Sequence, residues 1–274
     1  MSTRIAFIGG GNMATSLVGG LIAAGTMPAS IIIAEPDAGR RTQLTKKFDV
    51  ATTENNPETL LHDVVVLSVK PQLMQTVCRQ LAESANVQNP LYVSIAAGIR
   101  TTDIARWLGD DVAVVRCMPN TPALIQCGAT ALYANNTVSE AQQHLADEIL
   151  RAAGITTWVA DEDLLDVVTA LSGSGPAYFF LLMEAMQETA VKLGLDKETA
   201  ASLTLQTALG AARMANESEL DAQALRAHVT SKGGTTAAAI SSFEHDDFHN
   251  KVSKALHAAY NRSRELADEL GKDI

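Results

Sequence analysis

The N-terminal half of the chain alternates between short apolar runs and segments of helical periodicity. Continuous apolar runs predict strands at residues 4–8, 31–34, 64–69, 91–95 and 112–116. Continuous rather than alternating runs are typical of parallel strands that are covered on both faces. Between the first two runs, Met13, Leu17, Leu21 and Ala24 recur at helical spacing, and Gly25 is placed to end that helix. This order predicts a right-handed parallel crossover.

The pattern changes after the acidic tripeptide Asp161-Glu162-Asp163, beyond which no strand pattern follows. Pro176 is placed to open a helix whose residues 177–183 are nearly all apolar, which predicts a helix buried on every side. A second helix is expected over residues 197–214. A third is expected after Asn250, with a stripe at Val252, Leu256, Ala259, Ser263, Leu266 and Leu270. That stripe predicts a core face, or a subunit contact if the helix lies at the surface.

Composition narrows the class of protein. A chain of 274 residues that is 47% hydrophobic and 19% charged is neither disordered nor fibrous. Its net charge of −10 leaves no electrostatic basis for binding nucleic acid or an anionic membrane, so an anionic ligand must be held by local geometry. The three cysteines, Cys78, Cys117 and Cys127, cannot form a disulfide framework and fit a reducing compartment.

The uncharged stretch 5–34 superficially resembles a signal peptide or a membrane span. Its many glycines and Pro28 interrupt it, and Arg4 is its only basic flank. We therefore predict no membrane association and a cytoplasmic location.

Residues 7–14, Phe-Ile-Gly-Gly-Gly-Asn-Met-Ala, fit the pattern G-x-G-x-x-A between a predicted strand and a predicted helix. In this pattern Gly9 allows the turn, Gly11 allows close approach to a pyrophosphate, and Ala14 allows helix–strand packing. Amides at the helix start then face the phosphates. We interpret this segment as a Rossmann-type dinucleotide site made of Gly9, Gly10, Gly11, Asn12, Met13 and Ala14; the alternative is a tight turn without a ligand.

The predicted fold class is therefore α/β: an N-terminal Rossmann-type parallel sheet with helices on both faces, followed by an all-α domain. We place the dinucleotide-binding domain at residues 1–160 and the helical domain at residues 161–274.

The choice of cofactor is open at this stage. Glu35 ends the second predicted strand, about 20 residues beyond the glycine motif, where an acid commonly accepts hydrogen bonds from ribose hydroxyls. Arg40 and Arg41 follow closely and offer charges for a 2′-phosphate. These three residues permit either NAD or NADP.

Further cofactor contacts are predicted after the third and fourth strands, at Val69-Lys70-Pro71 and Ile95-Ala96-Ala97-Gly98. Open parallel sheets bind ligands beyond the carboxyl ends of their strands. The alternatives are a solvated lysine and an ordinary turn. Asn55-Asn56-Pro57 is likewise either a turn or a cofactor contact.

One segment of the C-terminal half is a candidate carboxylate site. Residues 231–236, Ser-Lys-Gly-Gly-Thr-Thr, precede a run of small residues, so their hydroxyls and amides meet at a helix start. The alternative is simple N-capping of the helix.

Three other features predict no chemistry. Residues 171–176 lack the first glycine of G-x-S-x-G, so they form no nucleophile elbow. His245 and His249 lack a third ligand, so no metal site is predicted. Cys117 has no neighbouring base and is not expected to be reactive.

In this order the segments resemble the pyrroline-5-carboxylate reductase family over nearly the whole chain. The resemblance is carried by residues 7–14, 69–71, 96–98, 116–122 (RCMPNTP), 171–178 (LSGSGPAY), Gln206-Thr207 with Gly210-Ala211-Ala212, and 229–236. LSGSGPAY together with MPNTP is far more specific than the glycine motif.

The resemblance implies hydride transfer from NAD(P)H to the C=N carbon of 1-pyrroline-5-carboxylate, which gives L-proline in the last step of proline biosynthesis. It implies a helical domain intertwined in a homodimer, which can itself be the unit of a larger ring. The implied cofactor contacts are Gly9–Ala14, Asn55, Ser68, Val69, Lys70, Pro71, Ile95, Ala96, Ala97 and Gly98. The implied substrate contacts are Ser231, Gly233, Gly234, Thr235 and Thr236, with the Thr236 hydroxyl as the catalytic group near the ring nitrogen.

Two positions depart from the family pattern. Lys232 replaces the proline of SPGGTT, which removes rigidity from the substrate loop and adds a cation. Glu35 replaces a neutral or basic residue. On family grounds NADP(H) is favoured, with NAD(H) as the alternative cofactor. The alternative functions are a β-hydroxyacid dehydrogenase type of reductase, which would need a lysine absent from residues 172–183, and a regulator without turnover.

Overall fold

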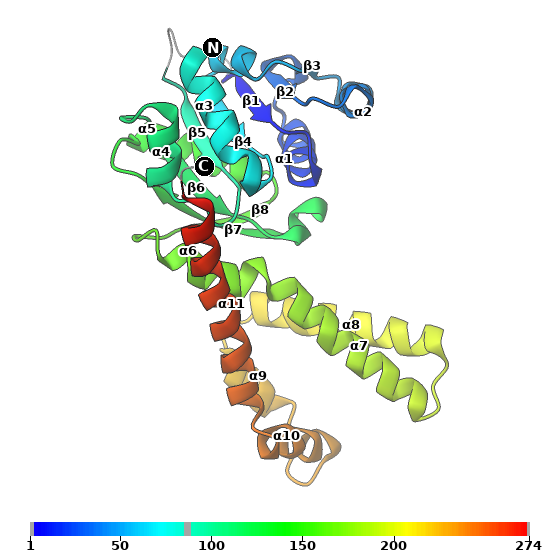
Figure 1. Cartoon of the computed structure of the whole chain (residues 1–274). Coiled ribbons are helices and arrows are strands. Elements are labelled where there is room, and N and C mark those ends of the chain that lie inside the picture. The colour runs from blue at the N-terminus through cyan, green and yellow to red at the C-terminus, as the bar shows by residue number, and fades with distance from the viewer. Residues whose placement is uncertain (1–2, 85–88, 273–274) are drawn as a thin grey trace. The chain divides into compact units, whose positions relative to one another are not determined.

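The computed structural model describes residues 3–84 and 89–272, which form two compact units (Figure 1). The first comprises the chain up to Ser174 together with the segment from Ala259 onward, and the second comprises Gly175–Ala258. The predicted boundary after residue 160 thus lies inside the first unit. The C-terminal segment also belongs to the first unit, because its residues Ser263 and Ala267 are buried there.

The first unit is built on a sheet of eight strands in the order β3-β2-β1-β4-β5-β6-β7-β8. The strands are β1 (Ile5–Ile8), β2 (Ile31–Ala34), β3 (Ala51–Thr53), β4 (Val64–Leu67), β5 (Leu91–Ser94), β6 (Val114–Met118), β7 (Gly128–Ala134) and β8 (Gly154–Trp158). All pairs are parallel except β6 with β7. The five predicted strands are confirmed, with ends within two residues of those expected.

The apolar pattern did not predict β3, β7 or β8. For β3 and β8, their position in the sheet and their burial explain why. Both lie at the edges of the sheet, and β8 alternates between exposed and half-buried residues instead of forming a continuous apolar run. β3 has three residues, none of them buried. The antiparallel β7 makes the sheet mixed rather than fully parallel.

Helices cover both faces of the sheet, as predicted. One face carries α1 (Asn12–Ala23), α2 (Ala38–Phe48) and α5 (Glu140–Arg151), packed on Ile5 and Phe7 of β1. The other carries α3 (Met74–Ser84) and α4 (Thr101–Leu108), packed on Ala6 and Ile8. Short helical turns lie at η1 (Pro28–Ser30), η2 (Asn56–Leu61), η3 (Pro71–Leu73) and η4 (Thr121–Ile125).

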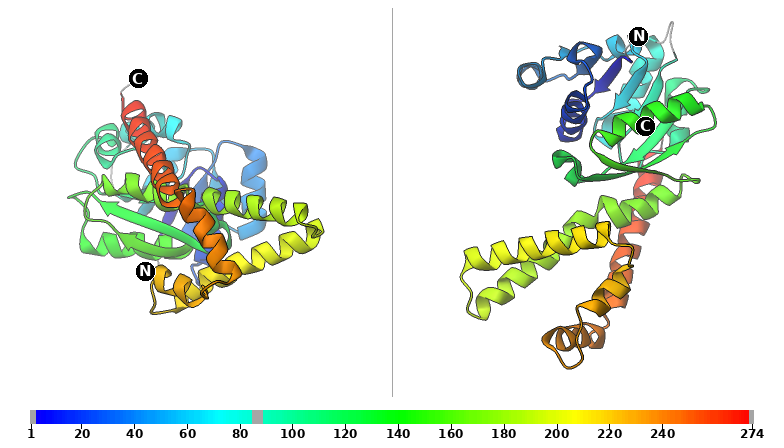
Figure 2. Two further views of the ribbon diagram at one scale, coloured as in Figure 1. Left: turned by 90° about the horizontal axis from the view of Figure 1, so that it is seen from below. Right: turned by 180° about the vertical axis from the view of Figure 1, so that it is seen from behind.

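The chain leaves the first unit through α6 (Leu164–Val168) and a π-helical turn, η5 (Thr169–Gly173). The second unit contains α7 (Gly175–Lys192), α8 (Lys197–Glu217), α9 (Ala222–His228), α10 (Thr235–His245) and the start of α11 (Phe248–Leu270). Its residues are all described and include no strand, which confirms the all-α prediction. α7 and α8 run side by side (Figure 2). Gly194, with φ of +112°, allows the turn between them, and Asp196 caps α8.

The prediction that α7 is buried on every side is wrong for the single chain. Its only buried residue is Gly175, whereas Phe179, Phe180 and Leu181 are each more than 60% exposed. The stripe on α11 is partly covered: Ser263 is buried, Leu256, Ala259, Leu266 and Leu270 are half-buried, and Val252 is exposed. A helical hairpin offers too few neighbours to cover its own apolar side chains.

The helical run Leu164–Lys192 also has the length and composition of a membrane-crossing helix, with a mean hydropathy of 1.3.

Candidate active site

Four of the predicted cofactor segments begin at the carboxyl ends of neighbouring strands. In the strand register, Ile8 pairs with both Ala34 and Leu67, and Leu67 pairs with Ser94. The residues that follow these strand ends are therefore neighbours, namely Gly9, Glu35, Ser68 and Ile95. Between β1 and β4 the strand order reverses direction, which is where open α/β sheets hold dinucleotides.

The glycine turn is crowded on one side and open on the other. Gly9 has φ of +95°, and a Cβ there would lie 2.7 Å from the Ser68 carbonyl oxygen. A Cβ on Gly11, by contrast, would meet no described atom within 4 Å, so this side of the turn is open. Gly11 is the N-cap of α1, and no side chain of the described residues caps the helix. Its first amides are therefore positioned to receive an anion.

Glu35 is bound to the glycine turn. Its Oε2 accepts from the Gly10 N–H at 2.8 Å, and its Oε1 accepts from the Asp37 N–H at 3.1 Å. Arg40 donates from Nε to the Gly10 carbonyl at 2.8 Å and from a terminal nitrogen to Thr15 Oγ1 at 2.7 Å. The sequence placed Arg40 near the cofactor but held no sign of its bond to the turn.

Arg41 contacts the backbone at the end of β2. It donates to the carbonyl oxygens of Glu35 and Pro36, both at 2.8 Å, and pairs with Glu54 at 3.2 Å. Two guanidinium groups thus flank the end of β2.

The segments that follow β4 and β5 lie at the same carboxyl ends of the strands. Ser68 Oγ donates to the carbonyl oxygens of Ile8 and Gly9 at 2.8 Å, which ties β4 to the glycine turn. Lys70 is exposed at the start of η3, and Gly98 has φ of +73°. Asn55 is exposed beyond β3, where its amide donates to Glu58 at 3.3 Å.

The two most specific sequence motifs contact each other. The side-chain amide of Asn120 donates to the Ser172 carbonyl oxygen at 3.0 Å, and its Oδ1 accepts from the Ala129 N–H at 2.9 Å. No periodicity in the sequence could have shown this contact, because 52 positions separate the two partners.

The candidate carboxylate site lies in the second unit, at the start of α10. Gly233 has φ of +72°, and Gly234 is the N-cap residue. No side chain among the described residues caps α10, so the alternative of a hydroxyl N-cap is wrong. Thr235 is exposed and Thr236 is half-buried, one residue into the helix. Lys232, where the family has proline, is exposed.

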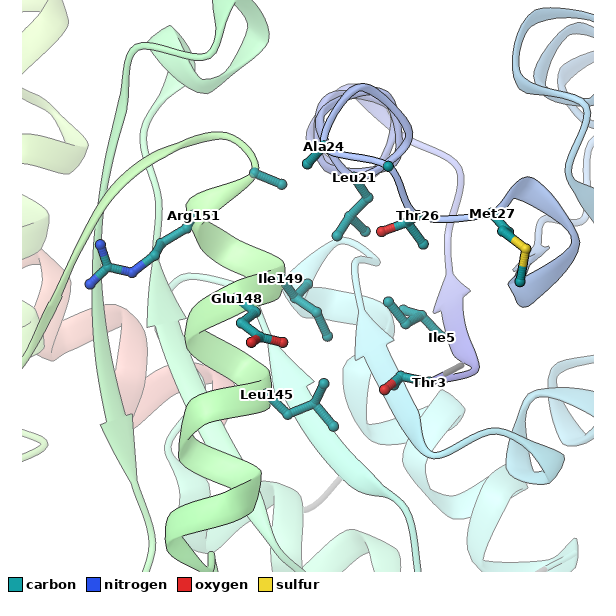
Figure 3. A pocket seen from close by; sticks show the side chains of 12 residues that line it. Thr3, Ile5, Leu21, Ala24, Thr26, Met27, Leu145, Glu148, Ile149 and Arg151 are labelled. Atoms are coloured by element: carbon teal, nitrogen blue, oxygen red, sulfur yellow. The ribbon is translucent and has the colours of Figure 1, made fainter. Parts of the chain in front are cut away.

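The remaining candidate groups lie apart from the segments described above. His245 and His249 are exposed, and the described residues contain no group of three or more metal-binding side chains. Cys117 is buried, and burial raises the pKa of its thiol well above the usual range. A pocket of about 620 Å³ lies near the amino end of β1, lined by Ile5, Leu21, Leu145 and Ile149, but it includes none of the predicted site residues (Figure 3).

A glycine turn at the reversal point of a mostly parallel sheet, followed by an all-α unit, defines the class of dinucleotide-dependent oxidoreductases. A family model described as an NADP oxidoreductase, coenzyme F420-dependent, matches residues 4–98, so this domain is of the NADP-binding type. A second model, described as pyrroline-5-carboxylate reductase dimerisation, matches residues 162–266.

Whole-length relatives identify the family. A pyrroline-5-carboxylate reductase of Pseudomonas aeruginosa is 54% identical over 99% of this chain and 100% of its own. A solved pyrroline-5-carboxylate reductase from Coxiella burnetii is 47% identical, with a TM-score of 0.93, over 97% of this chain and 99% of that one. That of Plasmodium falciparum, solved with NADP bound, is 28% identical, with a TM-score of 0.85, over 97% and 98% of the two chains.

The chain belongs to the pyrroline-5-carboxylate reductase family, the NAD(P)-dependent oxidoreductases of the final step of proline biosynthesis. This confirms the resemblance drawn from MPNTP and LSGSGPAY and rules out a β-hydroxyacid dehydrogenase. The dimerisation model also covers Leu164–Lys192, so the exposed apolar residues of α7 belong to a self-association domain rather than to a membrane helix.

Proposed function

We propose that this reductase takes NADPH in preference to NADH and holds it along the carboxyl ends of β1, β2, β4 and β5. The proposed contacts are Gly9, Gly10, Gly11, Asn12, Met13, Ala14, Glu35, Asn55, Ser68, Val69, Lys70, Pro71, Ile95, Ala96, Ala97 and Gly98. The open space at Gly11 and the uncapped start of α1 fit a pyrophosphate. The bound coenzyme supplies the hydride.

The preference for NADPH is carried by Arg40. A carboxylate repels a 2′-phosphate, and Glu35 stands where that phosphate would approach. Its two oxygens, however, already accept N–H groups from Gly10 and Asp37. Arg40 is held beside the same turn, and Arg41 donates to the backbone carbonyl of Glu35. Arg41 is already paired with Glu54, so Arg40 is the guanidinium group that favours the phosphorylated cofactor, and the Plasmodium falciparum relative was solved with NADP bound.

The substrate carboxylate is proposed to bind at Ser231, Gly233, Gly234, Thr235 and Thr236. The amides at the uncapped start of α10 can receive an anion even though the whole chain carries a charge of −10. The Thr236 hydroxyl is assigned to the ring nitrogen. A protonated imine is already electrophilic, so alignment and exclusion of water are the main tasks of the protein.

For assembly we propose a homodimer, alone or as the unit of a larger ring. The support is the exposed apolar side chains of α7, with Phe179, Phe180 and Leu181 among them, in a domain that matches a dimerisation model. That model spans residues 162–266, which supports a division by family into a nucleotide domain (1–160) and a helical domain (161–274); by packing, the two units divide after Ser174, and the segment from Ala259 belongs to the first. A cytoplasmic location fits a biosynthetic enzyme with three free cysteines.

The deciding experiment measures oxidation of NADPH and of NADH by the purified protein, with and without 1-pyrroline-5-carboxylate. Oxidation should require the imine, and kcat/KM should be higher for NADPH. Equal or better kcat/KM with NADH would overturn the cofactor preference. Cofactor binding without any turnover would instead indicate a regulator.

A further inference from the structure

A buried arginine lies where the nucleotide unit is crossed by the last helix of the chain. Arg116 of β6 is 4% exposed. One of its terminal nitrogens lies 3.0 Å from Glu162 and the other 3.9 Å from Asp166. Both carboxylates are largely buried as well. A buried charge that loses its partner is strongly destabilising, so this arginine holds its two acids in place.

Glu162 links Arg116 to the start of α4. Its two oxygens accept from the Thr101 N–H at 2.8 Å and from the Thr101 hydroxyl at 2.7 Å. The N-cap residue of α4, Arg100, provides no side-chain cap, so a carboxylate 61 positions away in the sequence serves that purpose. Thr101 follows closely on the proposed cofactor loop, residues 95–98.

Asp166 links Arg116 to α11. Its Oδ1 accepts from the Ser263 hydroxyl at 2.6 Å, and both groups are buried. Further along α11, Asp268 pairs with Arg100 at 2.8 Å. A Cβ on Gly98 would lie 3.4 Å from Leu270 and 3.5 Å from Leu266, so α11 packs directly on the loop.

These contacts form a closed circuit around the loop. One arm runs from Arg116 through Glu162 to Thr101, and the other runs through Asp166 and Ser263 to the helix that covers Gly98. We propose that Arg116 is a positioning residue for imine reduction, because it holds loop 95–98 between α4 and α11. This inference rests on the proposed role of that loop in binding the cofactor. It makes Glu162, Asp166 and Ser263 part of the catalytic support, although none is proposed to touch a ligand.

The test compares Arg116→Met, Arg116→Lys and Ser263→Ala with a matched control, Asp147→Asn. Asp147 is a partly buried carboxylate on α5 that accepts from Thr156 and Arg151, in the same unit but outside the circuit. We measure four quantities for each variant, well below its melting temperature: kcat, KM for NADPH, KM for the imine, and the dissociation constant for NADPH. Arg116→Lys keeps the buried charge, and Ser263→Ala removes one hydroxyl, so both give data even if Arg116→Met does not fold.

We expect kcat/KM for NADPH to fall about 10- to 100-fold in Arg116→Met and about 2- to 30-fold in Ser263→Ala, because small displacements of a positioned group are costly to the reaction. Arg116→Lys should fall between wild type and Arg116→Met. Asp147→Asn should lower only the melting temperature. If the circuit variants show only what Asp147→Asn shows, with normal kinetics at reduced stability, the cluster is merely structural and the inference is overturned.

A fifth variant, Gly98→Ala, separates this failure from that of the cofactor site. Its positive φ and its contact with α11 predict a displaced loop. If Gly98→Ala leaves all NADPH parameters unchanged, the loop is not a cofactor contact and the positioning role is overturned with it. If Gly98→Ala loses NADPH binding or turnover while Arg116→Met and Ser263→Ala resemble the control, only the positioning role is overturned.

Discussion

The side-chain amide of Asn120 donates to the Ser172 carbonyl oxygen at 3.0 Å and so joins MPNTP to the start of LSGSGPAY. In a regular helix that carbonyl would accept from the residue four positions on, which here is Pro176 and has no N–H. The amide of one motif therefore replaces the donor that the proline of the other motif lacks.

Replacing Asn120 should leave the Ser172 carbonyl without its partner. We expect Asn120→Ala to lower the free energy of unfolding by about 0.5–1.5 kcal/mol, the net contribution of a hydrogen bond, because the Ser172 carbonyl lies in a half-buried residue. Pro176→Ala restores a backbone donor, so the double variant should lose less stability than the two single changes predict. Urea unfolding of the four proteins measures this coupling, and strictly additive effects would contradict it.

Thr236→Ala tests the substrate loop. If the hydroxyl hydrogen-bonds the ring nitrogen or the carboxylate, its removal costs on the order of 1.5–3 kcal/mol, or roughly a 10- to 150-fold loss in kcat/KM for the imine. NADPH affinity should change little, and Thr236→Ser should retain most activity. Steady-state kinetics with a parallel melting curve provide the measurement. Normal kcat/KM in the alanine variant would remove Thr236 from the site.

Arg40→Ala tests the cofactor preference. Loss of a charge-assisted contact to the 2′-phosphate should reduce kcat/KM for NADPH about 10- to 150-fold, with a smaller effect on NADH through the loosened glycine turn. Lys46→Ala, an exposed cation on the same helix, is the control and should behave as wild type. Equal losses with both cofactors would show that Arg40 supports the turn without reading the phosphate.

Asp103 predicts a pH dependence of stability. Burial raises its pKa above the ordinary value of 3.8, although the charges of Arg106 and Arg100 act against this. The folded protein therefore holds the proton more tightly than the unfolded chain, and the free energy of unfolding falls as pH rises from 3.8 through the raised pKa. Asp103→Asn should flatten that decline in urea unfolding measured at several pH values. Asp110→Asn, an exposed change just beyond α4, should not; an unchanged slope in Asp103→Asn would refute the prediction.

The exposed apolar residues of α7 predict the outcome of a dissociation test. Phe180 is 62% exposed in the single chain, and Phe180→Asp would place a charge in a dimer interface. We expect light scattering to show an assembly for wild type and a shift toward monomer for this variant. Leu61→Asp, at 61% exposed in the nucleotide unit, should leave the assembly unchanged. A wild-type particle of 29.0 kDa at micromolar concentration would contradict self-association.

Local patterns determined much of this protein. Each parallel strand at the centre of the sheet is buried on both faces, so its apolar run is continuous and visible in the sequence. The glycine turn is visible for a similar reason, because a phosphate site needs glycines at fixed spacing beside a helix start. MPNTP and LSGSGPAY, as a resemblance, were enough to identify the family.

Tertiary structure alone decided how distant groups combine. Asn120 meets Ser172 across 52 positions, Asp166 meets Ser263 across 97, and Glu35 turns toward Gly10 across 25. None of these pairs leaves a periodic trace, since a hydrogen bond depends on where two chain segments are packed and not on their spacing. The apolar residues of α7 are a second case in which the sequence alone did not determine the outcome. Its composition predicted burial, but the single folded chain leaves it exposed, which fits the match of this segment to a dimerisation model.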